Sequence, residues 1–253
     1  VRFGATMLAS RRIEVAEAED DIEMMFTRGW TDGLPVVPPT EERVMRMLTG
    51  TTRAPSDIVA TVPPDLVDIS VEKVAIAAVM AGCLPEYLPW VLTAVEAACT
   101  DDFNMHGLLA TTMPVAPVIV CSGPGTRASG MNSAGNALGQ GNRANSTIGR
   151  ALQLVVRNVG GGRPGEVDRA THGGPAKVGF CFAENDLESP YGTLAAEHGI
   201  APGVDAITLF AGEGPRCVVD QLSREPDSLA RSLAAALQAL HHPKLVMAFD
   251  AIL

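Results

Sequence analysis

Residues 107–121 read Gly-Leu-Leu-Ala-Thr-Thr-Met-Pro-Val-Ala-Pro-Val-Ile-Val-Cys. Within this run, Val118-Ile119-Val120 is a series of β-branched residues that predicts a buried strand. A loop rich in glycine and asparagine follows over residues 122–145 and leads into an apolar helix over residues 151–158. Strand-like runs return at 177–183, 206–211 and 216–219. This mixture of strands and helices predicts an α/β or α+β fold, with a mixed sheet flanked by helices.

Helical patterns are found in much of the remaining chain. We expect helices at residues 11–28, 40–50, 70–82, 85–98 and 227–241, and a strand at 57–62. The helices at 70–82 and 85–98 carry apolar residues on nearly every side, which predicts that they are buried. The last helix has a stripe of leucines that we interpret as a core face, formed by Leu229, Leu233, Leu237 and Leu240.

The segment between the first two helices reads Trp30-Thr-Asp-Gly-Leu-Pro-Val-Val-Pro-Pro39. Its Asp-Gly pair and three prolines favour an extended course. We therefore expect residues 1–40 to form an N-terminal helix and an extended arm, and residues 41–253 to form one α/β core. The sequence stops at Ala251-Ile252-Leu253, inside an apolar run, and this favours a core that is truncated at its C-terminus.

Composition narrows the class of protein. Hydrophobic residues make up 47% of the 253, which supports a folded core and argues against disorder. The net charge is −10 and basic residues do not cluster, so nucleic-acid binding is not expected. A membrane-spanning stretch and a secretion signal are also missing from the sequence, which predicts a cytoplasmic protein.

The five cysteines show no pattern of a metal or disulfide framework. They are separated by 16 residues or more, without a Cys-x-x-Cys pair. We expect reduced thiols that are mostly buried as small hydrophobic side chains. Cys121 is the exception to consider, because it follows a predicted strand directly and could act as a nucleophile or redox group.

The most informative segment for function is the loop over residues 132–150. Its glycines are followed by Asn145, Ser146 and Thr147 at an expected helix start, where backbone N–H groups and the helix dipole favour an anion. An ordinary helix cap is the alternative interpretation. The segment lacks the nucleotide-binding glycine motifs. The residues expected to bind substrate here are Asn132, Asn136, Arg143, Asn145, Ser146 and Thr147, with Arg150 as a further donor.

Two histidines and one acidic segment could supply the chemistry. His106 and His172 each lie next to glycine at the edge of an expected element, where an imidazole can act as an acid or base near neutral pH. Glu184-Asn185-Asp186 follows a predicted strand, at the kind of strand end where α/β sites gather. Glu184 is therefore included as a substrate-binding residue. A solvated loop, or a metal site with the two histidines, remains open.

Several stretches resemble the bacterial UGSC-family (seleno)proteins and their longer relatives. These are Gly29–Thr40, Glu72–Ile76 with Ala81–Glu86, Arg143–Ala151 and Asn158–Gly161, and the likeness runs over most of the chain. The family name refers to a selenocysteine- or cysteine-Gly-Ser-Cys motif, which this sequence does not contain. The resemblance implies a shared enzyme-like site without a named substrate, and it assigns no catalytic residue.

Three functions follow as hypotheses. The first is a hydrolase or lyase that binds an anionic or carbonyl-bearing small molecule at the 132–150 loop, with His106 or His172 as acid/base and Arg143 stabilising negative charge. The second is a thiol-dependent redox enzyme that uses Cys121. The third is a non-catalytic assembly subunit whose 30–39 arm wraps a neighbour. A homo-oligomer or a partner subunit is expected, and neither a cofactor nor a metal is clearly indicated.

Overall fold

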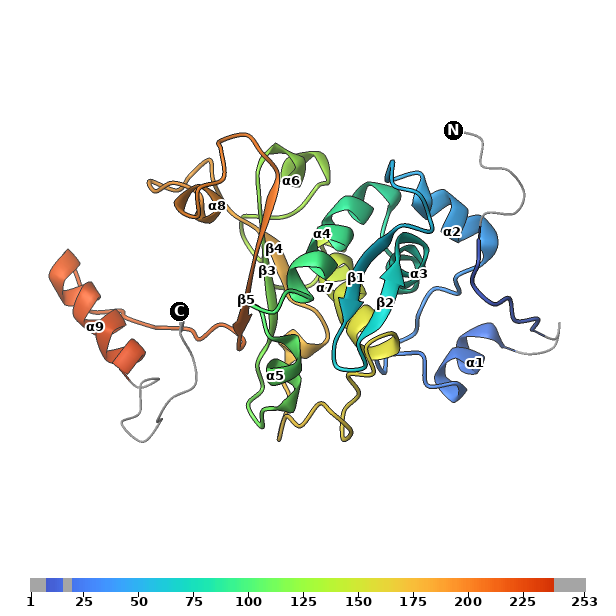
Figure 1. Cartoon of the computed structure of the whole chain (residues 1–253). Coiled ribbons are helices and arrows are strands. Elements are labelled where there is room, and N and C mark those ends of the chain that lie inside the picture. The colour runs from blue at the N-terminus through green and yellow to red at the C-terminus, as the bar shows by residue number, and fades with distance from the viewer. Residues whose placement is uncertain (1–7, 16–19, 239–253) are drawn as a thin grey trace. The chain divides into compact units, whose positions relative to one another are not determined.

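A computed structural model of the chain describes residues 8–15 and 20–238 (Figure 1). It divides the chain into two compact units, one up to Glu213 and one from Gly214 on. The first unit contains two small sheets with helices around them, and one of the sheets is mixed. The predicted α/β class with a mixed, helix-flanked sheet is confirmed. None of the described helices is long and apolar enough to cross a membrane.

The mixed sheet is built around β3 (Ala116–Ser122), whose seven residues are all buried. The strand β4 (Cys181–Ala183) pairs with β3 in parallel, and β5 (Ala206–Gly212) pairs with its other edge antiparallel. The strands predicted at 118–120 and 206–211 are confirmed. The strand predicted at 177–183 is shorter than expected because Pro175–Lys177 form a 3₁₀ turn, η2. The strand predicted at 216–219 is wrong, since these residues pair with no strand that the structure describes.

Three helices supply most of the hydrophobic core beside this sheet. They are α3 (Val71–Ala81), α4 (Leu88–Ala98) and α7 (Arg143–Asn158). Ser70 caps α3, and Gly82 ends it with a φ of +91°, as the sequence predicts. A 3₁₀ turn, η1 (Pro85–Tyr87), precedes α4. The prediction that these helices are buried is confirmed.

A hairpin and two short helices complete the N-terminal half. The strand β1 (Ile58–Val62) was predicted, whereas its antiparallel partner β2 (Val67–Ser70) was not. Thr40 caps α2 (Glu41–Leu48) as expected. The first helix is shorter than predicted, because residues 11–15 are not helical and Asp20 caps a helix, α1, that spans only Asp21–Thr27. The short helices α5 (Met105–Ala110), α6 (Pro124–Ala128) and α8 (Leu194–Glu197) were not predicted.

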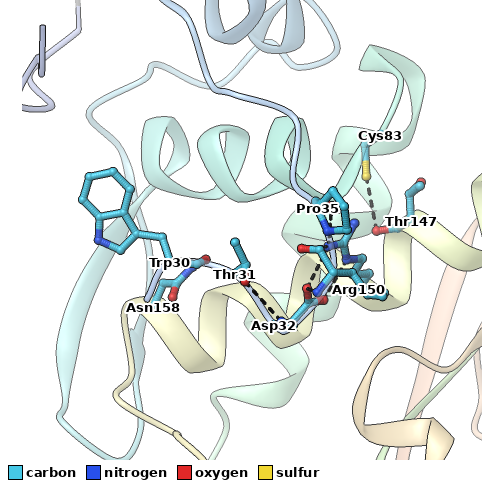
Figure 2. A network of polar contacts seen from close by, with 10 residues as sticks. Trp30, Thr31, Asp32, Pro35, Cys83, Thr147, Arg150 and Asn158 are labelled. Atoms are coloured by element: carbon cyan, nitrogen blue, oxygen red, sulfur yellow. Dashed lines mark hydrogen bonds and ion pairs between the residues drawn. The ribbon is translucent and has the colours of Figure 1, made fainter. Parts of the chain in front are cut away.

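The extended arm of residues 30–39 is bound to the first unit itself, along α7 (Figure 2). Arg150 donates to both carboxylate oxygens of Asp32, at 2.7 Å each. Further along α7, the Asn158 side chain donates to the Trp30 carbonyl at 2.8 Å. At the other end of the arm, the Val37 N–H donates to the Met80 carbonyl. The arm predicted to wrap a neighbouring molecule is therefore attached to its own chain.

The second unit contains the helix α9 (Pro226–Gln238). Its leucines at the predicted core face are exposed, with fractions of 46%, 46% and 55% for Leu229, Leu233 and Leu237. Within the second unit, no other described helix or strand covers these three leucines, so their core face stays a prediction. Leu240 and the predicted end of the helix at 241 lie outside the described residues.

Candidate functional site

A cavity of about 330 Å³ lies where β3 and β4 end. One wall is the loop that contains Ser133, Ala137 and Leu138. The other is formed by residues 182–186 and by Ser189, Gly192 and Thr193. The carboxyl ends of parallel strands are the usual place for ligand sites in α/β proteins, and the volume is within the range of small-molecule pockets.

Glu184 lines this cavity directly after β4. Its backbone N–H donates to the Cys121 carbonyl at 2.9 Å, which extends the parallel pairing of β3 and β4 by one residue. The Ser122 hydroxyl, at the end of β3, donates to one carboxylate oxygen, and the Leu194 N–H donates to the other at 2.8 Å. Ser122 is 3% exposed. The Glu184 carboxylate is therefore fixed by two donors at the cavity wall.

The cavity carries a second carboxylate, that of Asp186. An ion pair of 2.8 Å joins Asp186 to Arg127, in a partly exposed position. None of the described lining residues is basic, while the ring of Phe182 supplies an apolar surface. Arg127 balances the charge of Asp186, whereas no described lining residue supplies a cation for Glu184. The Glu184 carboxylate therefore disfavours an anionic ligand and favours an uncharged or cationic one.

Asn145 and Asn132 shape the loop wall of the cavity. The helix α7 begins at Arg143, two residues before Asn145, and its cap is the Asn142 side chain. Asn145 is 3% exposed, and its side chain accepts from the Asn132 N–H and donates to the carbonyls of Asn132 and Ala137. All the polar atoms of this side chain are engaged within the protein, so Asn145 positions the wall that carries Ala137.

The other polar residues predicted to bind substrate in the 132–150 loop have local structural roles. Asn136 adopts a φ of +61°, and its side chain donates to the Gln140 carbonyl. The Thr147 hydroxyl donates to the Arg143 carbonyl within α7. Ser146 is exposed on the same helix. None of these three side chains lines the cavity.

Both arginines predicted as anion donors bind groups of the chain itself. Arg143 donates to the Gly82 carbonyl at the end of α3, at 2.8 Å. Arg150 holds Asp32 in a bidentate pair and also donates to the Pro35 carbonyl. Burial acts to raise the pKa of Asp32, but the hydrogen bonds and charge of Arg150, together with the Leu34 N–H, outweigh it, so that this pKa is lowered. Arg150 thus recognises a carboxylate, and that carboxylate belongs to the arm.

The structure does not bring His106 and His172 to the 132–150 loop. His106 lies on α5, before the amino end of β3, and is exposed. His172 is exposed in a segment tied to the same region, where the Thr171 N–H donates to the Thr112 carbonyl. The strand β3 spans about 20 Å between this region and the cavity. The acid/base role predicted for these histidines therefore has no support from the cavity geometry.

Cys121 is fully buried on β3, with its Sγ atom 3.8 Å from the Sγ atom of Cys181. The contact with Cys121, together with burial, raises the pKa of Cys181. Neither cysteine lines the cavity. Its burial and raised pKa make the Cys181 thiol a poor nucleophile. This arrangement fits the expectation that most of the cysteines are inert core residues.

Ser122 and Ser133 were missed as site residues in the sequence. The signal that could have found Ser122 is the strand-end rule that singled out Glu184, applied to the neighbouring strand. Ser133 lies in the middle of a loop whose path no periodic pattern predicts. Over residues 8–15 and 20–238, no three histidine, cysteine or acidic side chains gather as metal ligands, so His106, His172 and Glu184 do not form the metal site considered above.

A second cavity of about 290 Å³ lies beside α4, α6 and the start of β5. Some of its polar groups are bound within the protein: the Trp90 indole N–H donates to the Ser129 hydroxyl, and an Asp205 oxygen accepts from the Gly125 N–H. The cavity with Glu184 is the stronger candidate because it lies at the parallel strand ends.

Comparison of the chain with protein-family models, curated proteins and solved structures finds no match.

Proposed function

We propose that this chain is an enzyme that acts on a small carbonyl-bearing molecule in the cavity at the ends of β3 and β4, with Glu184 as the acid/base group. The observation that carries the proposal is the Glu184 carboxylate, oriented by Ser122 and by the Leu194 N–H at the cavity wall. A positioned carboxylate can take a proton from a substrate or return it, and this step is needed in both hydrolase and lyase reactions.

The charges around the cavity define the substrate class. Glu184 and Asp186 contribute two carboxylates, and Phe182 contributes an apolar wall. A small amide, ester or amine-bearing carbonyl compound matches this lining better than a free carboxylate or phosphate. Of the two substrate types expected from the sequence, the proposal therefore keeps the carbonyl-bearing one.

The resemblance to the UGSC family belongs to the same proposal. Two of the resembling stretches, Gly29–Thr40 and Arg143–Ala151, are joined by the pair of Asp32 and Arg150. The residues of both stretches therefore share a structural role, because they attach the arm to α7. The cavity lies outside both stretches, so the proposed chemistry does not depend on the resemblance.

The proposal extends to location and self-association. All five cysteines are free thiols, although the Sγ atoms of Cys121 and Cys181 are close, which supports a reducing compartment such as the cytoplasm. A small-molecule substrate and a homo-oligomer are the proposed partners, and the net charge of −10 supports a protein that does not bind nucleic acid. A non-catalytic assembly subunit is the second candidate, favoured by β5, which is an edge strand of the described mixed sheet.

The test is turnover of a panel of small amides, esters and amine-bearing carbonyl compounds by the wild-type chain and by Glu184→Gln. We expect loss of Glu184 to lower turnover by about 100-fold or more, the size usual for a general acid/base. The matched control is Glu197→Gln, which removes an exposed carboxylate of α8 that does not line the cavity. Unchanged turnover in a folded Glu184→Gln variant would exclude the proposed role.

A further inference from the structure

The charge of the cavity at the ends of β3 and β4 depends on a residue that does not line it. Asp186 is the only described lining residue in an ion pair, and its Oδ1 atom lies 2.8 Å from Nη1 of Arg127. The second carboxylate oxygen, Oδ2, accepts no hydrogen bond from any residue that the structure describes. Arg127 itself is absent from the cavity lining. Its guanidinium therefore balances the charge of Asp186 from outside the cavity.

The helix α6 fixes the backbone of Arg127 beside the end of β3. Thr126, the residue before Arg127, is 3% exposed. The Gly125 N–H donates to Asp205 Oδ1 at 2.7 Å, which attaches the first turn of the helix to the segment before β5. After the helix, the Ser129 hydroxyl accepts a hydrogen bond from the tryptophan of α4. The guanidinium thus extends from a backbone that is attached on both sides.

The segment that follows β4 along the cavity is otherwise acidic. It contains Glu184, which lines the cavity without an ion pair, and Glu188, which accepts from the Asn185 side chain at 2.9 Å. Arg127 is the only arginine, lysine or histidine that forms an ion pair with a lining residue in the described part of the chain. Loss of its charge would leave Asp186 as a second unpaired carboxylate at the cavity wall.

We propose that Arg127 is a specificity-determining residue, which lowers the affinity of the cavity for ammonium-bearing compounds relative to uncharged ones. In the wild type, an ammonium group near Asp186 meets a carboxylate that is already paired, together with a guanidinium of like charge. This inference rests on the proposed function, because it takes the cavity as the substrate site. Within the proposed substrate class, it favours amides and esters over amine-bearing carbonyl compounds.

The test compares butyramide with 3-aminopropanamide, a probe of equal size in which an ammonium group replaces the methyl group. Dissociation constants are measured by ¹⁵N NMR titration at neutral pH. Arg127→Gln should strengthen the binding of 3-aminopropanamide relative to butyramide by about 5-fold, the size expected for one unit charge a few ångströms away in a partly exposed site. Glu184 attracts the ammonium group equally in both proteins, so the change between them reports on Asp186.

Two variants serve as controls for the ratio of the two dissociation constants. Arg127→Lys keeps the positive charge, and a single N–H donor is enough for the observed contact, so the wild-type ratio should be retained. Arg53→Gln breaks a partly exposed ion pair with Glu96, which does not line the cavity. It should leave the ratio unchanged.

Two further measurements distinguish an effect of charge from a structural role of Arg127. In an Asp186→Asn background, Arg127→Gln should change the ratio by less than about 2-fold, because no carboxylate is left to expose or to hold the guanidinium at the cavity. With Asp186 present, the effect of Arg127→Gln should shrink between about 0.01 M and about 1 M salt, as the Debye length falls from about 30 Å to about 3 Å.

An unchanged ratio in Arg127→Gln, with both probes bound, would overturn the inference. An equally large change in the Asp186→Asn background, or a change that salt does not reduce, would overturn it as well. If neither probe binds, this inference and the proposed function both fail. If the probes bind in the expected ratios but the chain turns over no amide, ester or amine-bearing carbonyl compound, the proposed function fails and the role of Arg127 in binding stands.

Discussion

Arg150 illustrates what a sequence can predict at the scale of one residue. An arginine near a helix start is correctly interpreted as a bidentate donor to a carboxylate. The sequence does not say which carboxylate, because Asp32 is 118 positions away along the chain. The same holds for Asn145, whose partners at Asn132 and Ala137 depend on the path of a loop. Residue chemistry was predictable, whereas the pairing of residues required the fold.

The pair of Asp32 and Arg150 should contribute strongly to stability. Both side chains are largely buried, at 11% and 14% exposure, so Asp32→Asn leaves a guanidinium without its counter-charge. We expect a loss of about 3 kcal/mol in the free energy of unfolding, measured in urea. The control is Arg12→Gln, which breaks an exposed ion pair with Glu41 and should change stability by less than about 1 kcal/mol. Equal small effects for both variants would contradict the structural role of Asp32.

The same pair predicts a pH dependence. Because the pKa of Asp32 is lowered in the folded protein, its contribution is fully present above the ordinary aspartate pKa and is lost as the pH falls through the folded-state pKa. The stability difference between wild type and Asp32→Asn should therefore be constant near neutral pH and shrink below about pH 4. Urea unfolding curves between neutral and acidic pH measure it. A difference that is unchanged in acid would show that Asp32 keeps an ordinary pKa.

At the scale of elements, most long helices were predictable and most short ones were not. Ser70 and Gly82 mark the two ends of α3 unambiguously. Before α7, in contrast, Asn142, Asn145 and Ser146 are all good capping residues, and only the packing selects Asn142. The short helices α5, α6 and α8 have four to six residues, too few to show a periodic pattern. The anion site expected at Asn145 depended on the position of this helix start, which the sequence alone does not define.

The contact between α7 and the segment before β4 depends on two glycines. A Cβ atom on Gly149 would lie 2.7 Å from the Phe180 nitrogen, and one on Gly179 would lie 2.6 Å from the Arg150 nitrogen. Gly149→Ala should therefore destabilise the protein by about 2 kcal/mol, although alanine is the better helix former. Thermal unfolding measures the change. Gly135→Ala, where a Cβ meets no atom within 4 Å, should change stability by less than about 0.5 kcal/mol. Equal stability of the two variants would contradict this close approach.

At the scale of the whole first unit, the sheet separates groups that the sequence places around one loop. His106 and His172 flank residues 132–150 in the sequence, yet both lie toward the amino end of β3. The reason is that α7 leads the chain back from the cavity, and Gly162, just after it, lies against Leu109 of α5. Glu184 comes to the cavity because β4 runs parallel to β3. Strand direction, which one sequence does not define, therefore decided which predicted residues share a site.

The cavity and its charge are tested most directly by a ¹⁵N NMR titration with two probes of equal size, butyramide and butyrate. We predict that butyramide shifts the backbone signals of Ala137, Asn185 and Gly192 around the cavity, that butyrate does not, and that Glu184→Gln reduces this discrimination. If neither probe shifts these signals, or if butyrate shifts them more than butyramide, the proposed carbonyl site beside Glu184 is contradicted.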